Sequence, residues 1–101
     1  MVKHIVMWKL KDAAEGGSRE QNAQRLKEKL EALRQTIPEI RGLEVGLNIN
    51  PSPEAFDVVL VSEFEDQAAL AAYQNHPEHR RLISEFLEKV RSEKRVVDYV
   101  V

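Results

Sequence analysis

The residues of this chain best suited to acid and base chemistry are its histidines and a nearby tyrosine. Two of the three histidines, His76 and His79, lie in the segment of residues 73–79 together with Tyr73. The third, His4, lies in an apolar stretch near the N-terminus. Imidazole has an ordinary pKa of about 6.5, so it readily gains and loses a proton near neutrality. These residues predict an acid-base site if the fold brings their rings together.

The elements that would position these rings follow from hydrophobic periodicity and capping residues. The first stretch alternates as a strand does, with His4 on the same face as Val6 and Trp8. Apolar residues three and four apart predict helices, Ser18 suits an N-cap, and Pro77 suits the first position of the last helix. We expect strands at residues 2–11, 43–49, 56–65 and 95–101, helices at residues 19–37, 67–74 and 77 to about 91, a loop at residues 12–17 and a turn at residues 50–53.

The order of these elements is β-α-β-β-α-β with a split second helix. It predicts one domain, residues 1–101, of the α+β class with a ferredoxin-like fold, in which helices cover one face of an antiparallel sheet. The other face would expose Ile5, Met7, Val59, Val61 and alternate residues of the last strand, where a sheet that met water would carry polar residues. We therefore expect a homodimer in which this face packs against its copy to form a dimeric α+β barrel.

Composition excludes several classes of partner. The chain is 43% hydrophobic and 32% charged with a formal charge of −2, which is typical of a globular protein that binds neither nucleic acid nor an anionic membrane. It has no cysteine, and its N-terminal residues lack the apolar run of a signal peptide. These features predict a cytoplasmic protein.

Three segments of the sequence, taken in order, form a recognisable pattern. They are Val2-Lys3-His4-Ile5-Val6 with Trp8-Lys9-Leu10-Lys11-Asp12, then Ile37-Pro38 with Gly42, Val45, Gly46 and Asn48, then Tyr73 with His76-Pro77-Glu78-His79. Together they resemble the Dabb family, the stress-responsive dimeric α/β barrel domain. The resemblance extends over essentially the whole chain and implies a ferredoxin-like subunit, a tightly packed dimer and a pocket between helices and sheet.

One branch of that family, the plant polyketide cyclases, closes a poly-β-keto thioester by aldol condensation. It uses a tyrosine and a histidine where this chain has Tyr73 and His79, and a strand histidine where this chain has His4. The resemblance implies that His79 is a general base, that Tyr73 orients the substrate or donates to a developing oxyanion, and that His4 assists. The chain departs from this branch at Val58, where the branch has a further histidine.

The expected pocket combines the strand face of His4 with the helical stripe of His79. We expect it to bind a small hydrophobic or polyketide-like carbonyl compound without a cofactor. The residues expected to line it are Val6, Trp8, Leu30, Val58, Leu60, Ser62, Leu82 and Phe86.

Other interpretations remain open at the level of sequence. His4 suits a hydrogen-bonded core residue as well as a pocket, and His76 suits a helix cap. Tyr73 suits a residue that simply buries its ring and forms a hydrogen bond with His79. The spacing of His76 and His79 across a helix start argues against a metal site. The chain is therefore either a histidine-dependent enzyme or a non-catalytic dimeric module that binds a ligand, with a cofactor-free monooxygenase as a more distant enzyme alternative.

Overall fold

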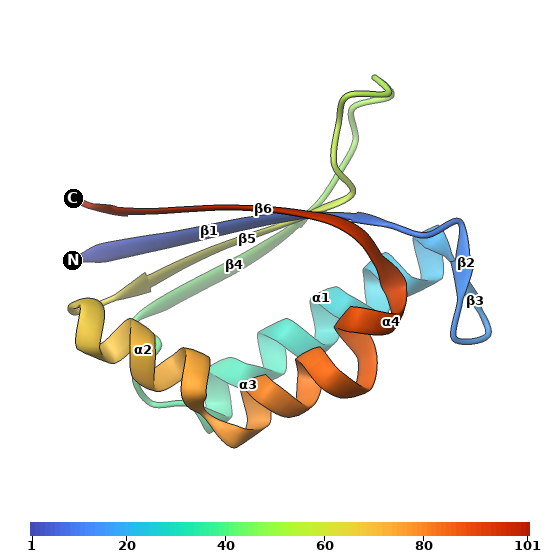
Figure 1. Ribbon diagram of the computed structural model, residues 1–101. Helices are drawn as coiled ribbons and strands as arrows, with labels where there is room; N and C mark the ends of the chain where they lie inside the picture. The colour runs from blue at the N-terminus through green and yellow to red at the C-terminus, as the bar shows by residue number, and fades with distance from the viewer.

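A four-stranded antiparallel sheet forms one layer and the helices form the other. The computed structural model describes residues 1–101, and Figure 1 shows all the long helices on one side of the sheet. The strand order is β4-β5-β1-β6, which confirms the predicted ferredoxin-like fold. The strands are β1 (Val2–Leu10), β4 (Gly42–Leu47), β5 (Val58–Phe64) and β6 (Arg91–Val100).

Strand β1 lies at the centre of this arrangement, between β5 and β6. Its even-numbered residues face the helices and are buried, whereas its odd-numbered residues are less buried. Val6 lies opposite Leu60 of β5 and Val96 of β6, so the even-numbered residues of β5 and β6 lie on the helix-facing side as well. The predicted alternation of β1 is confirmed.

A short hairpin replaces the loop expected at residues 12–17. Its strands are β2 (Ala13–Ala14) and β3 (Gly17–Ser18), and its turn residues Glu15 and Gly16 have φ angles of 48° and 71°. Two consecutive positive φ values are characteristic of the tight turns that match strand twist. The hairpin delivers the chain directly to the first helix.

Helix α1 (Arg19–Thr36) begins with a complete capping box. The Ser18 side chain accepts from the Gln21 amide, and the Gln21 side chain accepts from the Ser18 amide. The helix ends before Ile37 because the residue preceding Pro38 is restricted to extended conformations. Ser18 is therefore confirmed as the N-cap.

The second helical region is divided more finely than expected. It comprises α2 (Gln67–Asn75), α3 (Pro77–Leu82), a π-helical segment η1 (Ile83–Leu87) and α4 (Glu88–Val90). His76 separates α2 from α3, and its Nδ1 accepts from the Glu78 amide at 3.1 Å. The prediction that His76 caps a helix is confirmed, and so is the extent of the helix predicted from Pro77 to about Arg91, although its middle is π-helical.

The last strand starts four residues before its predicted beginning at Arg95. Residues 91–94 carry little hydrophobic signal, but their backbone continues the ladder with β1 through an irregularity at Lys9 and Leu10. The start of β6 is therefore determined by backbone pairing with the neighbouring strand and not by an alternation of its own side chains.

The hydrophobic core lies between the sheet and the helices, but the helices do not cover β6. Val96, on the helix-facing side of β6, is 49% exposed, and Val97, on the opposite side, is 54% exposed. Strand β6 is therefore an edge strand that is accessible on both faces.

None of the helices is long and apolar enough to span a membrane.

Candidate functional site

The structure brings together the three residues predicted to do chemistry. Tyr73 of α2 lies between the other two rings, with its ring centroid 4.5 Å from that of His79 in α3 and 6.2 Å from that of His4 in β1. Phe64 of β5 packs against the same tyrosine at 5.0 Å. The cluster therefore joins the central strand of the sheet to both helices at the α2–α3 junction.

Tyr73 is fully buried and its hydroxyl has no hydrogen-bond partner within the protein. Burial raises the pKa of this phenol far above its ordinary value, because the phenolate would lose its hydration. The hydroxyl therefore stays protonated at all physiological pH values. It is a proton-bearing donor that is not committed to any protein acceptor.

His79 is partly buried and is held in one orientation by the end of α2. Its Nδ1 lies 3.1 Å from the Gln74 carbonyl oxygen, which can only accept, so Nδ1 carries the proton and donates it. Burial lowers the pKa of His79, against the opposing effect of this hydrogen bond, and the charges of His4 and Lys94 lower it further. The neutral ring therefore keeps a free lone pair on Nε2, as a general base requires.

His4 is buried and is fixed by two neighbouring strands. Its Nδ1 donates to Oδ1 of Asp98 on β6 at 2.5 Å, and its backbone carbonyl accepts from the Ser62 hydroxyl at 3.0 Å. The Asp98 side chain is 40% exposed, so the pair connects the buried cluster to the surface. His4 is thus oriented by a carboxylate, in an arrangement that also fixes which nitrogen carries its proton.

Asp98 is a residue that the sequence interpretation missed. The clue in the sequence is its even-numbered position on the last strand, because an aspartate directly opposite His4 in an antiparallel ladder lies on the same face of the sheet as His4. This relationship appears only when β1 and β6 are known to be neighbours and when their register is known.

A groove of about 370 Å³ runs between α2 and the end of β6, next to this cluster. Asp98, the partner of His4, lines it, and so does Gln74, whose carbonyl holds His79. Apolar atoms come from both walls, including Leu70 and Val100. The groove brings solvent and small molecules close to the residues that orient both histidines.

The eight residues predicted to line a ligand pocket all lie in the buried interior. Six of them pack between sheet and helices or in the sheet itself: Val6, Trp8, Leu30, Val58, Leu60 and Ser62. The other two, Leu82 and Phe86, also reach a second groove of about 330 Å³ between α1 and α3–η1. Their assignment to a ligand pocket stays a prediction.

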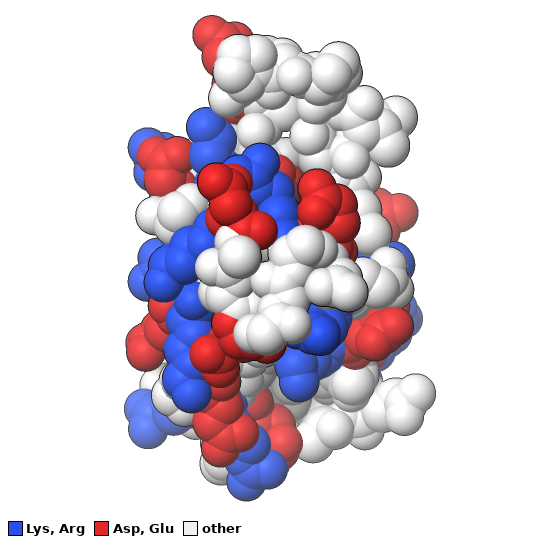
Figure 2. All heavy atoms as spheres, turned by 90° about the vertical axis from the view of Figure 1, so that its right-hand side faces the viewer, with Lys and Arg blue, Asp and Glu red and all other residues white.

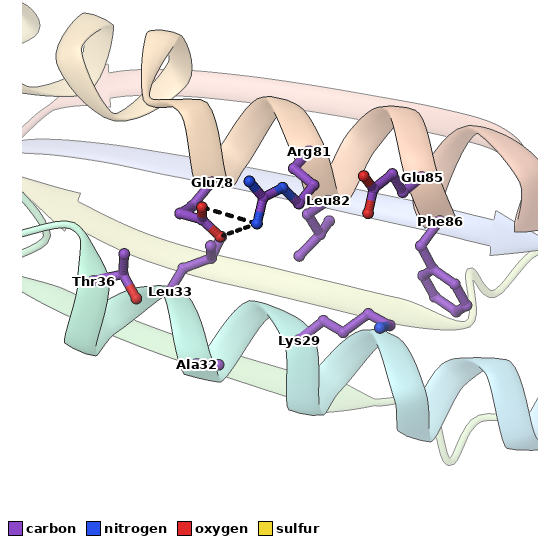
Figure 3. Close-up of a pocket in the computed structure, with 9 residues that line it drawn as sticks. All are labelled: Lys29, Ala32, Leu33, Thr36, Glu78, Arg81, Leu82, Glu85 and Phe86. Atoms are coloured by element: carbon purple, nitrogen blue, oxygen red, sulfur yellow. Dashed lines mark hydrogen bonds and ion pairs between the residues drawn. The ribbon is translucent and has the colours of Figure 1, made fainter.

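That second groove has a different chemical character. Figure 3 shows Glu78 and Arg81 paired at its rim and Leu33, Leu82 and Phe86 along its length. None of its lining residues belongs to the cluster of His4, Tyr73 and His79. The two grooves are therefore separate features of the molecule.

No group of three or more histidine, cysteine, aspartate or glutamate side chains is placed to hold a metal ion. His76 uses its Nδ1 to cap α3, and His4 uses its Nδ1 to bind Asp98. The three histidines therefore serve three different local roles.

These features define a ferredoxin-like α+β protein with a histidine and tyrosine cluster between its sheet and the α2–α3 junction. Residues 2–101 match the sequence profile of Dabb, the Stress responsive A/B Barrel Domain. The chain therefore belongs to the Dabb family.

Similar proteins agree with this assignment. The uncharacterized protein SCO4036 of Streptomyces coelicolor is 34% identical over 80 residues, which are 79% of this chain and 80% of that protein. A crystal structure from Bacteroides fragilis, described as a dimeric protein of unknown function with a ferredoxin-like fold, is 37% identical, covers 99% of this chain and 95% of that chain, and has a TM-score of 0.85. A hydroxynitrile lyase from Passiflora edulis has a TM-score of 0.82 over 99% of this chain and 92% of that chain, but at 18% identity it shows the shared fold alone.

Proposed function

We propose that this protein is a homodimeric enzyme that performs cofactor-free acid-base chemistry on a small, partly apolar, polyketide-like carbonyl compound. The observation that carries this proposal is the pairing of a proton acceptor with a proton donor. His79 keeps a free Nε2 lone pair, and Tyr73, 4.5 Å away between ring centroids, keeps a buried hydroxyl without a protein acceptor. Both groups are in the protonation states that their roles require at neutral pH.

The reaction step begins with a carbon that bears a proton next to a carbonyl group. Nε2 of His79 takes that proton. The electron pair of the broken C–H bond forms a double bond to the carbonyl carbon, and the substrate becomes an enolate with its negative charge largely on the oxygen. The Tyr73 hydroxyl donates a hydrogen bond to this oxygen and stabilises its new charge. The imidazolium of His79 then returns its proton to the substrate, either to carbon or to an oxygen formed by attack on a second carbonyl.

His4 and Asp98 have supporting roles in this proposal. The carboxylate fixes the orientation of the His4 ring, whose centroid lies 6.2 Å from that of Tyr73. We place the route to the cluster in the groove between α2 and β6, because its lining includes Asp98 and Gln74 and combines polar with apolar surface.

The dimer is proposed on two grounds. The face of the sheet without helices exposes Met7, Val97 and Tyr99, which a water-facing sheet would not carry together. The relative from Bacteroides fragilis, at 37% identity, is dimeric. Packing two such faces together buries these side chains in both copies.

A non-catalytic function is the second candidate, and the packing of the site supports it. Tyr73 is fully buried, and Val6, Trp8 and Leu60, among the residues expected to line a pocket, are close-packed in the core. In this alternative the protein is a dimeric ligand-binding or stress-response module. His79 and Tyr73 would then stabilise the α2–α3 junction without acting on a substrate.

The two candidates differ in a measurement that does not require the true substrate. Nuclear magnetic resonance in D₂O follows the exchange of protons next to the carbonyl of acetophenone and of the N-acetylcysteamine thioester of acetoacetate. We expect the protein to accelerate exchange and His79→Ala to lower this acceleration by about 100-fold or more, since general base catalysis contributes at least that factor.

The matched control is His76→Asn, because asparagine supplies an acceptor that also caps a helix. It should keep the full rate. An unchanged rate in His79→Ala, or no acceleration by the wild-type protein with either compound, would contradict the catalytic proposal and favour the ligand-binding module.

A further inference from the structure

The segment of residues 48–57, which we name the arm, connects β4 to β5 and projects from the sheet. Figure 1 shows it rising on the side of the sheet opposite to the helices. Two of its residues were expected to end one strand and two to begin the next, but β4 stops at Leu47 and β5 starts at Val58. The arm therefore extends ten residues beyond the regular pairing.

The arm is structured, although it lies outside the sheet. The Asn48 side chain bonds to the amide and the carbonyl of Asn50, at 2.9 and 2.8 Å, and the Asn50 side chain accepts from the Ser52 amide at 2.9 Å. Pro51 and Pro53 restrict its backbone further. Little conformational freedom remains to be lost when such a segment binds a partner.

The base of the arm is anchored to β1. The Asp57 amide donates to the Trp8 carbonyl at 2.8 Å, and the Asp57 carboxylate accepts from the Leu10 amide at 2.7 Å. The Lys9 ammonium donates to the Pro53 carbonyl at 3.3 Å. The arm is therefore held in a fixed direction relative to the sheet.

Ile49 is the residue of the arm that this geometry leaves without contacts. Its side chain is 98% exposed, which is more than any other large hydrophobic side chain in the protein. Figure 2 shows that the arm, at the top of the view, is mostly uncharged, whereas acidic and basic side chains are interspersed over the body below it. A single exposed apolar residue is ordinary by itself, so its position decides its meaning.

That position is continuous with the apolar face of the sheet. A hollow of about 330 Å³ lies at the base of the arm, lined on this face by Met7, Gly46, Phe56 and Val59. Gly46 leaves room there, since a side chain at this position would come within 3.0 Å of Val59. The arm and the apolar face therefore belong to one surface, and one partner can cover both.

We propose that the arm is a clasp between two copies of this chain, and that each copy buries its Ile49 against the other. The inference rests on the proposed homodimer and adds to it the segment that secures it. A two-fold axis repeats every contact, so one arm on each subunit gives two clasps. Because the second copy lies against the open face, it comes within reach of a segment that rises from that face.

Sedimentation velocity over a concentration series tests the clasp, with Ile49→Asp as the variant and Asn50→Asp as the matched control. Both changes add one negative charge to the arm, but only the first removes the apolar side chain. We expect Ile49→Asp to raise the dimer dissociation constant by about 100-fold or more, because two copies of the side chain lose their burial, and Ile49→Leu to restore most of the affinity. Asn50→Asp should change it by less than about threefold.

The outcomes separate the clasp from the dimer. A wild-type dimer with unchanged affinity in Ile49→Asp would overturn the clasp and leave the dimer standing. A monomeric wild-type protein would overturn both. Far-ultraviolet circular dichroism of Ile49→Asp should match that of the wild-type protein, since the side chain makes no contact within its own subunit.

Discussion

Strands β1 and β6 are neighbours of nearly equal length, but their surroundings differ completely. Every even-numbered side chain of β1 is buried beneath the helices. On β6 the even-numbered Val96 and the odd-numbered Val97 are exposed to similar extents, 49% and 54%. The two strands share a hydrogen-bonded ladder, so the difference comes from what covers them and not from their own backbone.

The isolated subunit is incomplete at β6. Strand β1 carries His4 into a finished core, whereas β6 carries Asp98 to a surface that remains accessible. The apolar side chains of Val96 and Val97, exposed on opposite faces of β6, are costly unless a partner or a ligand covers them. In the proposed function, the second subunit covers the odd-numbered side of β6, and the substrate approaches its even-numbered side.

The substitution Val97→Asp should have the largest effect, because it places a charge in the proposed subunit interface. We expect the dimer dissociation constant, measured by sedimentation equilibrium, to rise by about 100-fold or more, since burying an uncompensated carboxylate in both copies costs several kcal/mol. The matched control is Val96→Asp, on the same strand and equally exposed but on the helix-facing side. It should leave dimer formation within about threefold of the wild type.

Equal weakening by both substitutions would mean that β6 contributes through its edge and not through one face. Weakening by Val96→Asp alone would place the partner on the helix side and would contradict the proposed packing of two sheets.

The side chains of His4 and Asp98 form the contact between the buried strand β1 and the exposed strand β6. Asp98→Asn keeps the shape of the side chain but removes the negative charge of the carboxylate that accepts the hydrogen bond from the His4 ring. We expect the free energy of unfolding in urea to fall by about 1 kcal/mol, less than for a buried charged hydrogen bond because Asp98 is partly exposed.

Glu93→Gln is the control for this loss, since Glu93 is also on β6 and pairs only with surface cations. It should change the free energy of unfolding by less than about 0.5 kcal/mol. Equal losses in the two variants would show that the His4–Asp98 pair is an ordinary surface interaction.

Much of this contrast could be predicted from the sequence, since it depends on local patterns. The alternation of residues 2–11, the capping role of Ser18 and the helix break at His76 each depend on a few adjacent residues. The apolar residues on both faces of the sheet were also recognisable in the sequence, and they led to the predicted dimer. The convergence of His4, Tyr73 and His79 followed from the fold once these elements were in order.

The missing parts depend on long-range relationships. Asp98 pairs with His4 across 94 positions of sequence, and only the register of β1 with β6 places them on the same face. The early start of β6 at Arg91 is set by backbone pairing with Leu10. The exposure of Val96 follows from the extent of the helical layer, which no periodicity within β6 can report.

Tyr73→Phe changes a side chain in the core that the helices cover, and its effect on stability should be similar in size to that of Asp98→Asn but opposite in sign. The hydroxyl is buried without a protein partner, so its removal should raise the free energy of unfolding by about 1 kcal/mol. The acceleration of enolisation should fall in the same variant, since the oxyanion loses its donor.

Tyr99→Phe is the matched control for the isolated subunit, because Tyr99 is the second tyrosine of the chain and lies exposed on the odd-numbered side of β6 before the proposed dimer forms. At protein concentrations below the dimer dissociation constant, its unfolding free energy should be unchanged. A loss of stability in Tyr73→Phe would show that the hydroxyl has a stabilising partner and is not available to a substrate.

The pH dependence contributed by His79 should be the smallest of these effects, because the ring is only partly buried. Its pKa in the folded protein is lowered, chiefly by burial, so the folded state binds fewer protons than the unfolded state at pH values between the folded pKa and about 6.5. The contribution of the neutral His79 ring to the free energy of unfolding should therefore be fully present above about pH 6.5, and it should decrease as the pH falls through this interval. His79→Gln should flatten this part of the curve of unfolding free energy against pH. A nuclear magnetic resonance titration of the His79 ring that gave a pKa above 6.5 would contradict the sign of the effect, and with it the assignment of a neutral base beside the buried tyrosine.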